Sequence, residues 1–184
     1  MNKIEYIMDT SVILRRFQYD IYEYDSFPIH WNNFDKLIDE RRIISPPSVK
    51  KEILFKSQEL RNWCDKNDKM FVPPDNNIVE ELGFLSEEFP DWYLANINSK
   101  KDGADPYLVA YAKVYGAVIV TQEKWDSDTK KEHNYKIPTV CAKLGAYCHI
   151  GKSISKDVGL DAPFQCIDFF EMIKRESLFQ SLNY

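Results

Sequence analysis

Residues 102–123 read DGADPYLVAYAKVYGAVIVTQE, and this stretch decides the fold of the chain. Asp105 and Pro106 indicate a helix start, because Asp accepts hydrogen bonds from the unpaired N–H groups of a first turn and Pro is compatible with that turn. Gly116 indicates the end of the helix, since glycine readily takes the left-handed conformation found there. Residues 117–120 follow at once and are apolar on both faces, as in a parallel strand covered by helices. The stretch therefore predicts a helix that leads into a buried parallel strand.

The rest of the chain continues this alternation of strands and helices. Residues 3–8 form a short strand that stops at Asp9, and residues 43–44 form another, each followed by a segment with helical spacing. Further helices are expected over residues 28–41, from Ser48, and over 59–66 and 77–89. A strand is expected around residues 137–141 and a polar inserted loop over about 149–162. A last helix is expected through Ile167, Phe170 and Ile173. The pattern predicts a single α/β domain over residues 1–184, with a central, mainly parallel sheet of four to five strands flanked by helices.

The composition argues against several classes of protein. The chain has 184 residues, with 24 Lys and Arg against 29 Asp and Glu, and its net charge of -5 disfavours a protein that coats nucleic acid. No apolar run approaches the ~18 residues of a membrane span. The first residues lack the apolar core of a signal peptide, so we expect a cytoplasmic protein with reduced cysteines and no membrane partner.

Four acidic residues are predicted to meet at one edge of the sheet. Asp9 and Glu123 each follow the carboxyl end of a strand, and Asp105 begins the helix that leads into the second of these strands. Glu52 lies one turn into the helix after residues 43–44. Ligands of open α/β sheets bind outside the carboxyl ends of the strands. Each residue has a simpler explanation by itself, as a helix cap or a solvated carboxylate, and it is their common placement that favours a site.

A cluster of carboxylates requires positive charge, because like charges at short range disfavour ionisation of one another. Oxygen-only ligands suit Mg2+ or Mn2+. Two such ions about 3.5–4 Å apart can orient and activate a water and stabilise the leaving oxygen of a phosphodiester. Thr10 or Ser11 could add a hydroxyl to the set. The sequence therefore favours metal-assisted hydrolysis of a phosphodiester.

The same segments resemble the PIN-domain nucleases, in particular an uncharacterised bacterial PIN-like branch. The resemblance extends from Tyr6 to about Lys143 and rests on DTSV (9–12), SVKKEI (48–53), ADPYLVAYA (104–112) and VIVTQE (118–123). It implies a three-layer α/β/α fold and a Mg2+- or Mn2+-dependent endoribonuclease with RNA as its substrate. The catalytic and metal-binding residues that it implies are Asp9, Glu52, Asp105 and Glu123. The family includes VapC-type toxins, so the resemblance also implies the toxin of a toxin–antitoxin pair, with an antitoxin protein as a candidate partner.

The chain departs from the family pattern at the fourth acidic position. Glu123 stands where the family usually has Asp, and Asp126 lies three residues further on and could share its role. Asp102 is a second candidate beside Asp105. The departure keeps open a non-catalytic PIN-like scaffold that acts by binding a protein or RNA partner.

Two further features bear on mechanism and assembly. A phosphoryl-transfer enzyme with Asp9 as covalent nucleophile is disfavoured, because phosphatases of the haloacid dehalogenase type need a second Asp where this chain has Ser11. The seven aromatic residues between Phe17 and Phe34 predict a core or a subunit interface, which makes a homodimer a candidate assembly.

Overall fold

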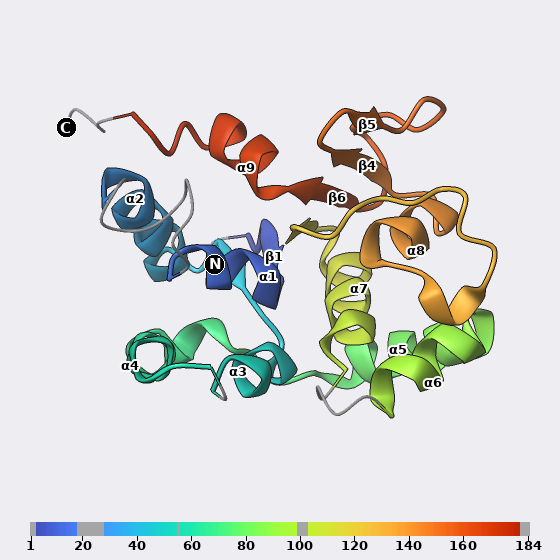
Figure 1. The fold of residues 1–184 in the computed structure, drawn as a ribbon, viewed down its shortest axis with the longest axis horizontal. Coiled ribbons are helices and arrows are strands. Elements are labelled where there is room, and N and C mark those ends of the chain that lie inside the picture. The colour runs from blue at the N-terminus through green and yellow to red at the C-terminus, as the bar shows by residue number, and fades with distance from the viewer. Residues whose placement is uncertain (1–2, 18–27, 55, 99–102, 181–184) are drawn as a thin grey trace.

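A computed structural model describes residues 3–17, 28–54, 56–98 and 103–180. The described residues form a sheet of six strands in the order β2-β1-β3-β6-β4-β5 (Figure 1). Neighbouring strands run parallel, except that β5 pairs antiparallel with β4 at the sheet edge. The strands are β1 (Tyr6–Met8), β2 (Ile43–Ile44), β3 (Val118–Thr121), β4 (Tyr147–Ile150), β5 (Ser153–Ile154) and β6 (Gln165–Asp168).

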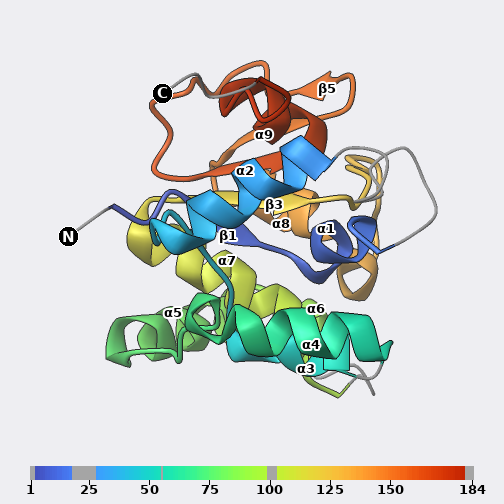
Figure 2. The same cartoon turned by 90° about the vertical axis from the view of Figure 1, so that its left-hand side faces the viewer.

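Helices cover both faces of this sheet. On one face lie α2 and α9, and on the other lies α7, with α3 to α6 beyond it (Figure 2). The helices are α1 (Thr10–Arg15), α2 (Pro28–Asp39), α3 (Pro47–Leu54), α4 (Gln58–Lys66), α5 (Asn76–Glu88), α6 (Pro90–Ile97), α7 (Ala104–Tyr115), α8 (Ile137–Lys143) and α9 (Phe169–Arg175). Short 3-10 turns are η1 (Asp68–Met70) and η2 (Glu132–Asn134). The predicted α/β class is confirmed, but the sheet of the described residues has six strands where four to five were expected. Within the described residues, every helix is too short or too polar to cross a membrane.

The helix and strand that decide the fold form α7 and β3. Gly116 has a φ of 59° and ends α7, as predicted. The start differs, because Gly103 is the N-cap residue, with a φ of 53°. Asp105 lies inside the first turn and makes no capping hydrogen bond, so its predicted role as helix cap is wrong. The physical reason is the close approach of Gly103 to α6, which turns the chain into the helix before the Asp-Pro pair.

Residues 137–141 belong to helix α8, and the strand predicted there is wrong. All five residues are buried, so their apolar run lacks the periodicity that separates a helix from a strand. Pro138 stands in the first turn of α8, where proline is favoured.

The chain after residue 146 holds more regular structure than expected. The predicted polar loop over 149–162 begins inside β4 and includes β5. Ile167 lies in β6 rather than in the last helix, which begins at Phe169. The carboxylate of Asp168 caps that helix by accepting from the Glu171 N–H over 2.7 Å. The helix α6 was not predicted, because Pro90 and the short span between α5 and α7 gave no clear helical spacing.

The aromatic residues of α2 are part of the core. Trp31 and Phe34 are fully buried, and both contact the ring of Phe169 in α9, at centroid distances of 5.3 and 6.0 Å. Tyr19, Tyr22, Tyr24 and Phe27 lie outside the described residues. All four cysteines are buried free thiols, as predicted.

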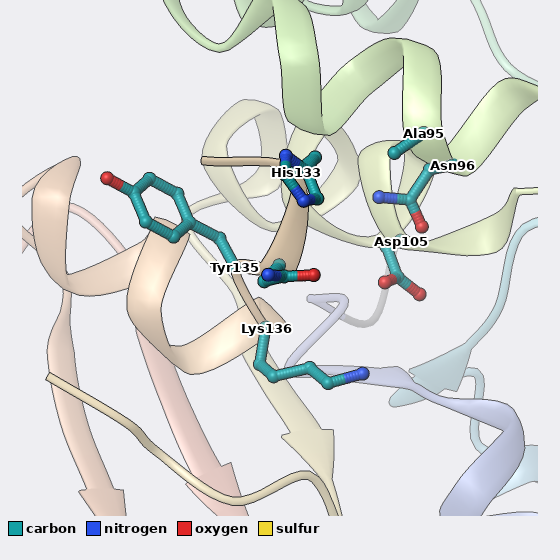
Figure 3. A pocket seen from close by; sticks show the side chains of 7 residues that line it. Ala95, Asn96, Asp105, His133, Tyr135 and Lys136 are labelled. Carbon is teal, nitrogen blue, oxygen red and sulfur yellow. The ribbon is translucent and has the colours of Figure 1, made fainter. Parts of the chain in front are cut away.

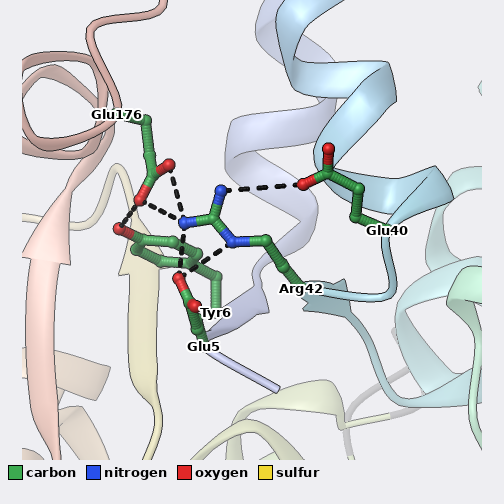
Figure 4. Close-up of polar contacts among 5 residues, drawn as sticks. All are labelled: Glu5, Tyr6, Glu40, Arg42 and Glu176. Atoms are coloured by element: carbon green, nitrogen blue, oxygen red, sulfur yellow. Dashed lines mark hydrogen bonds and ion pairs between the residues drawn. The ribbon is translucent and has the colours of Figure 1, made fainter. Parts of the chain in front are cut away.

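Arg42 connects three elements at the amino ends of the strands (Figure 4). Its guanidinium donates to Glu5, before β1, at 2.5 Å, and to Glu176, after α9, at 2.8 Å. The Tyr6 hydroxyl also donates to Glu176, at 2.6 Å. This network joins the start of β1, the turn before β2 and the end of α9.

Candidate metal centre

The carboxyl ends of β1 and β3 lie side by side, because Met8 pairs with Val120 in the parallel register. Asp9 follows β1 directly, and Glu123 lies two residues beyond the end of β3. The helix α3 packs against α1 and α7, which places Glu52 and Asp105 near the same edge. Four separate elements thus supply the four acidic side chains predicted from the sequence.

Asp9 is buried, with 6% of its surface exposed. Its Oδ2 accepts hydrogen bonds from the hydroxyls of Ser11 and of Thr121, the latter at 2.7 Å. Asp9 occupies the N-cap position of α1 but makes no side-chain capping bond. Burial, and to a smaller extent the charges of Glu123 and Glu52, raise the pKa of Asp9 to about 6 against the lowering effect of the two hydroxyls.

Thr121 ties two of the carboxylates together. Its fully buried hydroxyl donates to Asp9 and accepts the N–H of Glu123 at 3.1 Å. The Ser11 hydroxyl also donates to Asp9, and it accepts the N–H of Gln122, the residue before Glu123, at 3.0 Å. These two hydroxyls fix the end of β1 to the segment that follows β3.

Glu52 and Glu123 are held by donors of the protein itself. Glu52 Oε2 accepts from the Thr10 hydroxyl at 2.5 Å, and its Oε1 accepts from the Ala104 N–H at 3.4 Å. Glu123 Oε1 lies 3.2 Å from Lys136 Nζ, and its Oε2 accepts from the Ile137 N–H at 2.9 Å. Thr10, proposed from the sequence as a metal-site hydroxyl, therefore contacts Glu52 here.

The surroundings of Asp105 also raise the pKa of its carboxyl group. Burial, followed by the negative charges of Glu123, Asp9 and Glu52, raises its pKa well above the usual value, and the ammonium of Lys136 opposes this. No residue in the described part of the chain donates a hydrogen bond to its carboxyl group. Asp105 is therefore a half-buried carboxyl group with acidic neighbours and, among the described residues, no hydrogen-bond donor of its own.

The less central candidates lie elsewhere. Asp126 is exposed, and its carboxylate accepts from the Asp128 N–H at 3.0 Å. A hydrogen bond from Thr129 and then the one from Asp128 lower its pKa. The charge of Asp126 is not among the causes of the raised pKa values of Asp9 and Asp105. Asp102 lies outside the described residues.

Two residues of this site were not predicted from the sequence. The sequence gives a weak indication of Thr121, since it is the polar residue that ends a buried strand and such residues face the site at the carboxyl edge. It gives no indication of Lys136, because this residue is 13 positions beyond Glu123 in the chain and only the fold brings it back.

A polar pocket of about 170 Å3 opens beside the cluster (Figure 3). Asp105 forms one wall, and Lys136 extends toward it from the other side. The remaining lining residues are Ala95, Asn96, His133, Asn134 and Tyr135. The pocket opens the half-buried carboxyl group of Asp105 toward solvent.

The donor set fits a hard divalent cation in its chemistry. All four side chains are carboxylates, and the half-buried Asp105 has neither a cationic partner in contact nor a hydrogen-bond donor within the described residues. As the side chains stand, no three Asp, Glu, His or Cys residues among those described are grouped to hold a metal ion. Glu52 and Glu123 are engaged with Thr10 and Lys136 instead.

Comparison with known proteins gives one match. The model of a family described as a domain of unknown function (DUF4411) matches residues 6–150, a range that contains all four carboxylates. No curated protein and no solved structure matches the chain.

Proposed function

The chain belongs to the DUF4411 family, and we propose that it is a metal-dependent ribonuclease that hydrolyses RNA phosphodiester bonds with Mg2+ or Mn2+. The observation that supports this is the meeting of Asp9, Glu52, Asp105 and Glu123 at the carboxyl edge of the sheet, with Asp105 half-buried and without a hydrogen-bond donor among the described residues. Such a cluster costs free energy in the protein alone, and a divalent cation removes the cost. The sequence resemblance to PIN-domain nucleases gives the substrate class.

Each residue has a task in this proposal. Asp9, Glu52, Asp105 and Glu123 would hold the cation, which supplies positive charge and Lewis acidity to the phosphodiester. The hydroxyls of Thr121 and Ser11 orient Asp9, and Thr10 orients Glu52. The Ile137 N–H orients Glu123. In the cation-free protein, burial and then its acidic neighbours raise the pKa of Asp105, which favours its protonated form.

The first prediction concerns Asp105→Asn. Asparagine keeps the shape of the side chain and removes an ionisable group from among like charges, so the variant should fold, while the site loses one of its four anionic ligands. We expect the rate of Mn2+-dependent hydrolysis of single-stranded RNA to fall by roughly 100-fold or more. The measurement is cleavage of a labelled single-stranded RNA, with thermal unfolding to verify folding.

Asp126→Asn is the matched control, because it removes an exposed carboxylate outside the cluster and should retain activity. Cleavage that persists in EDTA, or equal rates for the wild type and Asp105→Asn, would contradict the nuclease.

A second candidate is a non-catalytic PIN-like scaffold that acts by binding a protein or RNA partner. The engagement of Glu52 with Thr10 and of Glu123 with Lys136 favours it, since both carboxylates already have partners. Calorimetry with Mn2+ separates the two functions. The scaffold predicts no Mn2+ binding that depends on Asp105, whereas the nuclease predicts binding that Asp105→Asn weakens.

We further propose that this nuclease is the toxin of a toxin–antitoxin pair. An antitoxin protein would then be its partner.

A further inference from the structure

Two consecutive residues engage both carboxylate oxygens of Glu123. Lys136 Nζ lies 3.2 Å from Oε1, and the Ile137 N–H donates to Oε2 at 2.9 Å. We propose that Lys136 is a built-in counter-ion of the acidic cluster, a positioning residue that holds Glu123 in the cation-free protein and that a divalent cation must displace. This inference rests on the proposed function.

The fold fixes the backbone position of Lys136, so its contact with Glu123 does not depend on the conformation of a surface side chain alone. Glu132, four residues earlier, accepts the Asp91 and Trp92 N–H groups at 2.7 and 3.2 Å, which fixes the loop to the start of α6. The ring of Tyr135 contacts Phe89 edge to face, with 6.5 Å between the ring centroids. The backbone at residue 136 is therefore anchored on both sides, by α6 and by the start of α8.

The ammonium group is placed so that it can leave. The Lys136 side chain is 56% exposed, whereas that of Glu123 is 20% exposed. The ammonium group therefore contacts the cluster from its solvent side. Lys136 also lines the pocket beside Asp105, which gives the displaced side chain open space (Figure 3).

Glu123 would stay in place when Lys136 departs. Its Oε2 accepts from the Ile137 backbone N–H, and this donor keeps its place when the Lys136 side chain moves. Its Oε1 would then be released toward the other carboxylates. The geometry thus separates the two interactions: Ile137 fixes the carboxylate, and Lys136 neutralises it until a stronger cation arrives.

The test is calorimetric titration of Mn2+ into the full chain and into three variants. Lys136→Met removes the charge at nearly constant length, and a unit charge beside a divalent ion repels it strongly at such distances, so we expect about tenfold tighter Mn2+ binding. Lys136→Arg retains the charge and should bind Mn2+ with nearly wild-type affinity. Lys131→Met is the matched control, because it removes an exposed lysine from the same loop and changes the net charge equally. It should also bind Mn2+ like the wild type.

A second measurement tests the counter-ion without any metal. In EDTA, Lys136→Met should unfold at a lower temperature than Lys131→Met, because Glu123 loses its neutralising partner. If the wild type binds Mn2+ and Lys136→Met binds it equally or more weakly, the counter-ion proposal is overturned and the metal site stands. If the wild type binds no Mn2+, the proposed function is overturned. In that case, equal unfolding temperatures of the two variants in EDTA would also remove the counter-ion role.

Discussion

At the scale of single residues, Asp9 lies at the end of β1 with two hydroxyl donors on one oxygen and two further carboxylates nearby. The hydroxyls favour its ionised form, while burial and the acidic neighbours disfavour it. Burial is the largest effect, so the folded pKa of about 6 lies above the ordinary value of 3.8. The protein without a cation therefore binds this proton more tightly when folded than when unfolded.

The resulting prediction is a loss of stability with rising pH in EDTA. For a group whose folded pKa is raised, the stabilisation is complete below pH 3.8 and is lost as the pH rises through about 6. The free energy of unfolding should thus fall across that interval, by an amount on the order of 2–3 kcal/mol from Asp9. Denaturant unfolding at a series of pH values measures this slope.

Two variants assign that slope to Asp9. Asp9→Asn retains an acceptor for Ser11 and Thr121 and should show a flatter dependence, with the remaining slope due to Asp105. Asp126→Asn should keep the wild-type slope, because the pKa of this exposed group is lowered and not raised. A wild-type slope in Asp9→Asn would contradict the assignment.

At the scale of the elements, the entry into α7 decides where Asp105 lies. Gly103 takes a left-handed conformation, and a Cβ added to it would lie 2.6 Å from the Asn96 carbonyl oxygen. The chain can therefore pass against α6 and enter the helix only with glycine at this position. This close passage sets the first turn of α7, and with it Asp105, against the pocket.

We predict that Gly103→Ala destabilises the protein by about 2–4 kcal/mol, from the left-handed conformation and from the backbone overlap together. Gly145→Ala is the matched control, because Gly145 also has a positive φ, of 79°, but has open space where a Cβ would stand. It should cost about 1–2 kcal/mol, from the conformation alone. Urea denaturation of the two variants measures the difference, and equal losses would show that the approach to Asn96 has no energetic effect.

At the scale of the whole molecule, the acidic groups at the two ends of the parallel strands are neutralised to different degrees. The carboxyl ends gather Asp9, Glu52, Asp105 and Glu123, and among the described residues Lys136 forms an ion pair with Glu123 alone. The amino ends carry Glu5 and Glu176 with Arg42 between them, so that the acidic groups there are neutralised by a cation in contact. The carboxyl ends are therefore arranged to accept positive charge. The amino ends carry the Arg42 network, which joins separate elements of the fold (Figure 4).

Arg42→Met should therefore destabilise the protein without affecting the proposed site. Glu176 is only 14% exposed, and it would lose its cation, at a cost of about 1–3 kcal/mol. Mn2+ affinity should remain at the wild-type value, because the change lies at the far ends of the strands. Denaturant unfolding and Mn2+ calorimetry measure the two effects.

Lys69→Met is the control, since Lys69 and Asp39 form an ion pair with exposed side chains, and such pairs contribute little. Equal destabilisation by Arg42→Met and Lys69→Met would show that the network around Glu176 is energetically no different from a surface pair.

The sequence by itself determined the α/β class, the positions of β1, β2 and β3, the end of α7 at Gly116 and the four acidic residues at the sheet edge. These features are encoded locally, in apolar runs, in helix boundaries and in carboxylates next to strand ends. Only the tertiary structure decided that residues 137–141 are helical, since a fully buried run has no periodicity, and that Gly103 rather than Asp105 begins α7. It also decided the partners of each carboxylate. Lys136 reaches Glu123, and Thr10 reaches Glu52, because helices and strands distant in the chain pack together, and no local pattern records such contacts.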